Sequence, residues 1–179
     1  MSSSIIKLID SAIIPAALII LGKVLGLYII ISLFGLEWQM NFENNALIGV
    51  YPVVFEKDLL LASSGSDLIM LLVVLSGLAF ETIRGVYFHN THVDPKIIVR
   101  LTKVNLLGLV KDSFQIYYKA SMWFVFSVVG VIYVILNSIQ GRTFFWVPIS
   151  GTIILIILTV LLIRDIELEI EKGKENLSF

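Results

Sequence analysis

Four apolar segments limit what this chain can fold into more than any other feature. They cover about residues 9–36, 67–88, 120–139 and 144–163. The hydrocarbon core of a bilayer is ~30 Å thick, and a helix needs ~20 mostly apolar residues to cross it. Each segment reaches that length or comes close to it. The sequence therefore predicts an all-α integral membrane protein, a single domain over residues 1–179 with four transmembrane helices.

The composition agrees with lipid as the solvent. The chain is 58% hydrophobic and 15% charged, whereas soluble domains average ~45–50% and ~25%. The net charge of −1 provides no basic field, so we expect no nucleic-acid partner. The sequence has no cysteine, which excludes disulfides, thiolate metal sites and cysteine nucleophiles.

The distribution of Lys and Arg predicts how the chain is threaded, because these residues concentrate on the cytoplasmic side of membranes. With the N-terminus inside, Lys57 and Arg142 fall outside and Lys23 lies within the first span. All the others fall inside: Lys7, Arg84, Lys96, Arg100, Lys103, Lys111, Lys119, Arg164, Lys172 and Lys174. We therefore expect a multi-pass protein of the cytoplasmic (inner) membrane with both termini in the cytoplasm.

The external loop, residues 37–66, contains strand-like sequence. Apolar and polar residues alternate over 38–42, and residues 47–55 are rich in strand formers. The sequence predicts a short β-hairpin in this loop. Ser66 or Asp67 then fits the N-cap of the second span.

A basic amphipathic helix is predicted over residues 95–118, between spans two and three. Asp94 and Pro95 form a helix start, with an N-cap residue followed by proline. Four basic side chains share one narrow face: Lys96, Arg100, Lys103 and Lys111. Such a helix lies in the headgroup plane, with its basic residues on anionic lipids of the cytoplasmic leaflet. Alternatively, it packs under the bundle and its lysines snorkel. The tail, residues 164–179, continues the last helix into the cytoplasm.

Lys23 and Glu81 are the two clear cases of an ionisable residue inside a span, where charge is costly and often functional. Lys23 lies near the middle of span one, and Glu81 lies in span two with Arg84 one turn later. They indicate an intramembrane ion pair or a polar pathway. Alternatively, Glu81 and Arg84 form a local i,i+3 pair while Lys23 snorkels outward. Gly22 and Gly26 have the small-xxx-small spacing that lets helices pack closely.

His89, His92 and Asp94 form the one cluster in the sequence that suggests metal ligands. Two histidines at i,i+3 share a helix face, and Glu81 could add an oxygen. No HExxH signature accompanies them, and histidines in a loop often only cap or hydrogen-bond. The sequence contains no other catalytic motif, and we expect no cofactor.

The stretch Phe80-Glu81-Thr82-Ile83, followed by Tyr87, His92 and Pro95, resembles the phosphate-starvation-inducible E family of small four-span proteins. The resemblance is confined to residues 80–95, and the long insertion before the third span departs from it. It implies four spans and no particular activity.

Three functions are compatible with these features. The first is a non-enzymatic subunit or scaffold of a membrane assembly, a homo-oligomer or a complex with other subunits. The second is an oligomeric small transporter or channel that uses Lys23 and Glu81. The third is a membrane-interface enzyme or metal protein that uses His89, His92 and Asp94.

Overall fold

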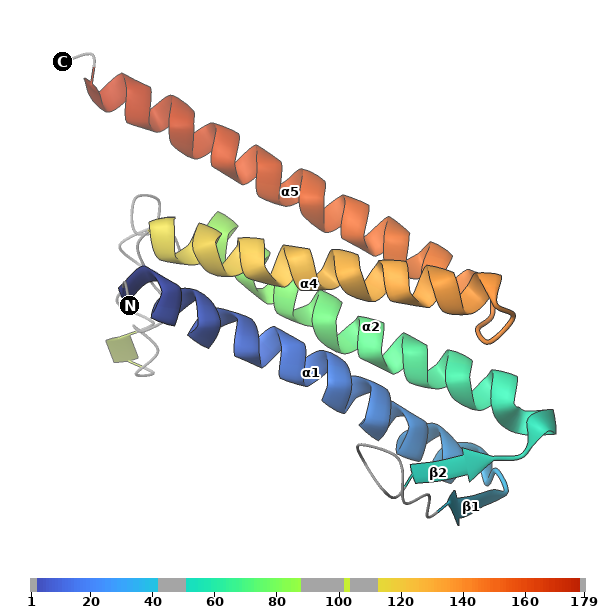
Figure 1. The fold of residues 1–179 in the computed structure, drawn as a ribbon. Helices are drawn as coiled ribbons and strands as arrows, with labels where there is room; N and C mark the ends of the chain where they lie inside the picture. Colours follow the sequence, from blue (N-terminus) through green and yellow to red (C-terminus); the bar gives the residue numbers. More distant parts are fainter. Residues whose placement is uncertain (1–2, 42–50, 88–101, 104–112, 178–179) are drawn as a thin grey trace.

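The computed structural model describes residues 3–41, 51–87, 102–103 and 113–177. Four long helices account for most of them (Figure 1): α1 (Ser3–Phe34), α2 (Glu56–Tyr87), α4 (Ser113–Ile139) and α5 (Trp146–Leu177). Each helix is long and apolar enough to cross a membrane. The prediction of four long apolar helices is confirmed, and these helices suggest a multi-pass membrane protein.

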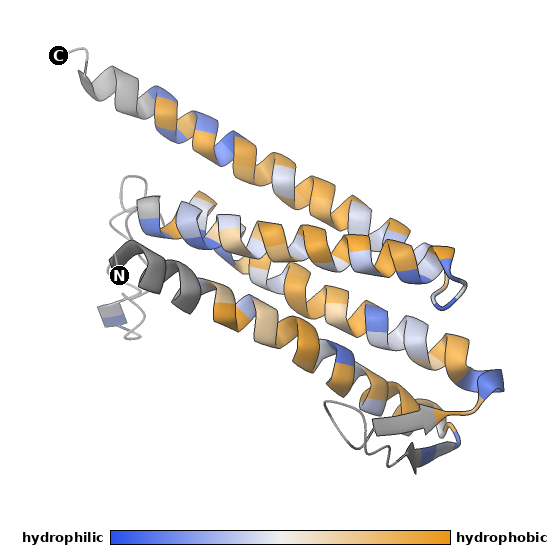
Figure 2. Ribbon diagram, viewed as in Figure 1, coloured by the Kyte–Doolittle hydropathy of each residue, from blue (hydrophilic) through white to orange (hydrophobic). Residues whose placement is uncertain are grey.

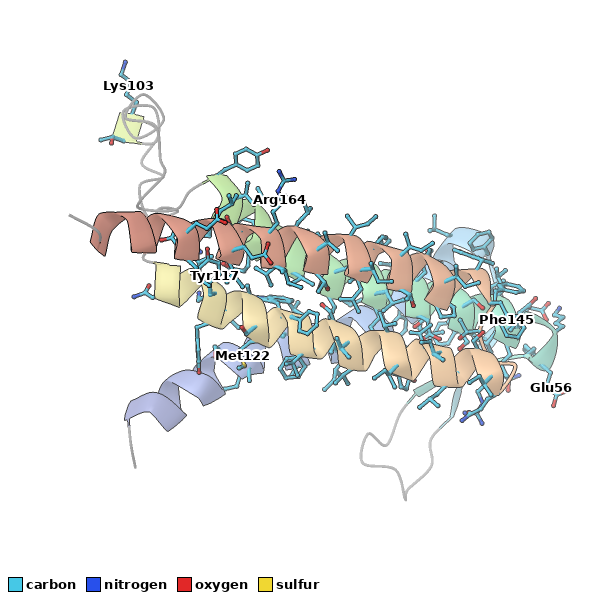
Figure 3. The ribbon with its side chains drawn as sticks, turned by 90° about the horizontal axis from the view of Figure 1, so that it is seen from above. Glu56, Lys103, Tyr117, Met122, Phe145 and Arg164 are labelled. Atoms are coloured by element: carbon cyan, nitrogen blue, oxygen red, sulfur yellow. The ribbon has the colours of Figure 1, made fainter. Side chains whose placement is uncertain are left out.

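Helix α2 is the central element of the bundle, because α1, α4 and α5 all pack against it. Both chain termini lie at one end of the bundle, and the two short strands lie at the other (Figure 1). We refer to these as the terminal end and the strand end. In Figure 3, Tyr117 and Arg164 lie toward the terminal end, and Glu56 and Phe145 lie toward the strand end.

The core lies where α2, α4 and α5 meet. Its buried side chains are Met70, Leu71, Leu75, Leu78, Val131, Val134, Val147 and Leu158. Hydrophobic residues make up much of the length of the helices (Figure 2), and many of them are exposed. Leu33, Ile139 and Phe145 are each more than 70% exposed. Exposing such apolar side chains to water is unfavourable. The faces that carry them are therefore suited to contact with lipid or with another apolar helix.

Two short strands lie between α1 and α2. β1 (Trp38–Asn41) pairs antiparallel with β2 (Tyr51–Val54), and Trp38 is opposite Val54. The Trp38 ring also meets the Tyr28 ring of α1 edge-on, with centroids 6.4 Å apart. Val54 is buried against Ile31 of α1 and Ala62 of α2. These contacts fix the strand pair against the first two helices.

Several helix boundaries differ from those expected. Helix α2 begins at Glu56, so the N-cap predicted at Ser66 or Asp67 is wrong: both residues lie inside the helix. Residues 113–118, expected to end the interfacial helix, are the first residues of α4. Most of the interfacial helix predicted over 95–118 lies outside the described residues.

Candidate functional site

Asp67 lies at the centre of a buried polar network. Its side chain is fully buried within α2, and its Oδ1 forms an ion pair with Lys23 Nζ of α1. Its Oδ2 accepts hydrogen bonds from Asn137 Nδ2 of α4, at 3.1 Å, and from Thr143 Oγ1. A buried charge is costly unless it is paired and hydrogen-bonded. We call Lys23, Asp67, Asn137 and Thr143 the Asp67 network.

Lys23 makes a second contact in addition to its ion pair. Its Nζ lies 5.8 Å from the centroid of the Tyr133 ring on α4, within range of a cation–π interaction. The Lys23 side chain is 29% exposed, whereas that of Asp67 is fully buried. The ion pair therefore has one side sealed in the bundle and one side near its surface.

Two glycines of α1 permit the close approach that forms this pair. A Cβ on Gly26 would lie 3.1 Å from the Cα of Ser66, and a Cβ on Gly22 would lie 3.2 Å from backbone of α2. The Ser66 Oγ also donates to the Lys23 carbonyl at 2.6 Å. Because the two backbones come this close, Lys23 can reach Asp67.

The turn after α4 brings Thr143 to the network. Gly141 has φ 72°, the left-handed conformation typical of a helix C-terminus, and its N–H donates to Ser138 O at 3.0 Å. The Phe144 N–H then donates to Ser64 Oγ of α2 at 2.9 Å. The second bond holds the turn against α2. Thr143 lies in the chain between Gly141 and Phe144, the two residues whose N–H groups make these bonds.

Glu81 and Arg84 form a separate ion pair nearer the terminal end. The two groups are 3.5 Å apart at i,i+3, and both residues are almost fully buried, at 5% and 6% exposure. Glu81 Oε2 has no hydrogen-bond partner among the described residues. The geometry matches the local i,i+3 pair of Glu81 and Arg84 that the sequence allows as one alternative. Lys23, which the same alternative turns outward, is instead paired with Asp67.

A further polar contact joins α4 and α5 at the terminal end. The Tyr117 hydroxyl donates to Asp165 Oδ2 at 3.1 Å. Asp165 can approach α2 because Gly85 has no side chain: a Cβ there would lie 2.7 Å from the same oxygen. Polar contacts therefore tie the helices together at both ends of the bundle.

An apolar core separates the two ion pairs. Asp67 and Glu81 lie on the same helix, ~21 Å apart along its axis. Met70, Leu71 and Leu78 fill the interval and are at most 2% exposed. Among the described residues, Lys23 pairs with Asp67 and Glu81 pairs with Arg84, so Lys23 and Glu81 belong to separate ion pairs.

Most of the other predicted site residues lie outside the described residues. These are His89, His92, Asp94, Lys96, Arg100 and Lys111. Lys103 is described and is exposed, at a distance from the four helices (Figure 3). Among the residues that the structure describes, no group of three or more His, Cys, Asp or Glu side chains could hold a metal ion.

Asp67, Asn137 and Thr143 are the members of the network that sequence reasoning misses. Serines and a glycine precede Asp67, so the sequence pattern predicts a loop there. It therefore gives no sign that Asp67 is buried inside a helix. One signal does point to it: a lysine in the middle of a span requires a counter-charge at similar depth. Asn137 and Thr143 carry no comparable signal, because polar residues at the end of a span are ordinary.

Comparison with known proteins assigns neither a family nor a function to this chain. The chain shows no match to a protein-family model, to a curated protein or to a solved structure. The resemblance over residues 80–95 is therefore not supported by a family match, and the geometry of the site is the basis for assigning a function.

Proposed function

We propose that this chain is a non-enzymatic subunit or scaffold of a membrane assembly, which acts through contacts of its helices with other helices. One observation supports this most. The charged groups deep in the described spans pair with one another, Lys23 with Asp67 and Glu81 with Arg84. Pairing leaves them little capacity for chemistry, while the outward faces remain apolar.

Helix α5 presents a broad apolar face to the outside of the bundle. Its side chains that are more than half exposed include Ile149, Ile153, Ile156, Ile157, Val160 and Ile163. In a bilayer, helix association depends on packing and polar contacts rather than on escape from water. A face of this kind fits either lipid or a partner helix, and we assign it to a partner.

The proposal also includes the membrane in which the chain lies and its orientation there. We place it in the cytoplasmic membrane with both termini inside and the strand pair, as a hairpin, on the external surface. We assign the predicted helix over 95–118 to the cytoplasmic leaflet, where Lys96, Arg100, Lys103 and Lys111 would contact anionic headgroups. The partner is a second copy of the chain or another membrane subunit.

Native mass spectrometry of the chain, gently extracted from its host membrane, tests the proposal. We expect stoichiometric complexes containing additional subunits, of the same or another sequence. A strictly monomeric chain, in detergents that preserve known complexes of the same membrane, would contradict it.

Cysteine cross-linking in intact membranes tests the surface itself. The chain has no native cysteine, so an introduced cysteine is the only thiol of the chain that can form a cross-link. Ile157 is 53% exposed, whereas its neighbour Leu158 is 9% exposed. We expect Ile157→Cys to cross-link to a partner or a second copy and Leu158→Cys to remain unlinked. Equal yields from both variants would contradict α5 as the contact face.

A second candidate function, an oligomeric transporter or channel, is favoured by the Asp67 network. Ion pairs within spans often mark ion or proton pathways, and Lys23 is partly exposed. Glu81 belongs to a different cluster, so the candidate rests mainly on Lys23 and Asp67. We would measure ion and proton flux in proteoliposomes. Unchanged flux in Lys23→Leu and in Glu81→Gln would exclude this function.

A further inference from the structure

We draw no further inference here: the strongest candidate, the apolar groove between α1 and α4 beside the Lys23–Asp67 ion pair, opens on the outer face of the described helices, and nothing in the structure shows what covers it.

Discussion

Asp67 shows how one residue determines the arrangement of its neighbours. Its carboxylate is fully buried, and it has partners on α1, on α4 and in the following turn. Removing one partner of a buried ion pair leaves an uncompensated charge, which typically costs ~3–5 kcal/mol, whereas replacing both partners is often nearly neutral. The energetic role of Asp67 is therefore conditional on the presence of Lys23.

This dependence predicts strong coupling between Lys23 and Asp67. We expect Lys23→Met and Asp67→Asn to differ in severity. The lysine substitution leaves a buried carboxylate and should cost ~3–5 kcal/mol, whereas Asp67→Asn orphans an ammonium that is partly exposed and should cost less. The double variant should be more stable than Lys23→Met alone. Unfolding in mixed micelles with increasing dodecyl sulfate measures each value, and the cycle isolates the coupling.

The exposed pair of Lys57 and Glu37 provides the control. Its two groups are 3.1 Å apart, with side chains 64% and 67% exposed. Because solvent screens such pairs, we expect Lys57→Met to change stability little. Additive effects of Lys23→Met and Asp67→Asn would contradict the geometry of the network.

At the scale of elements, glycines determine how closely the helices approach. The clearest case is Gly77 of α2, where a Cβ would overlap the Trp123 ring of α4. The indole therefore fills the space that a side chain at 77 would need. The spacing of Gly22 and Gly26 is enough to predict close packing there, but an isolated glycine such as Gly77 gives no such pattern.

This contact predicts opposite effects at two glycines. Gly77→Ala should destabilise the bundle by ~1–3 kcal/mol, because over-packing displaces a large ring. Gly130→Ala should be neutral or stabilising, because its Cβ has space and alanine favours the helix. The same unfolding assay distinguishes them. A comparable loss in both variants would contradict the Trp123 contact as the reason for the loss at Gly77.

For the whole molecule, the pattern of apolar residues is enough to predict four long helices. It does not predict their register, that is, which residues of neighbouring helices lie opposite each other. Long apolar stretches specify helices that can span a membrane, and α1, α2, α4 and α5 follow. Register depends on contacts between distant residues. The start of α2 is mispredicted because residues 63–67 look like a loop, although they form one side of the contact with α1 and with the turn after α4.

The same-end placement of the termini allows a test of topology. We expect Lys57→Cys to react with a membrane-impermeant maleimide in intact cells, because Lys57 lies toward the strand end and is exposed. Glu171→Cys, exposed near the end of α5, should react only after permeabilisation. The reverse labelling pattern would invert the orientation proposed from the Lys and Arg distribution.

The pairing of α1 with α2 also has a consequence for biogenesis. An aspartate or a lysine at the centre of a span costs ~2.5–3.5 kcal/mol when a translocon releases that span into lipid. Lys23 is synthesised first, and the Asp67 segment follows it into the membrane. If α1 waits at the translocon, the two can leave together as a neutral hairpin, and neither charge has to enter lipid alone. The turn that carries Thr143 arrives last and closes the site, so the order of synthesis matches the order in which the charges need partners.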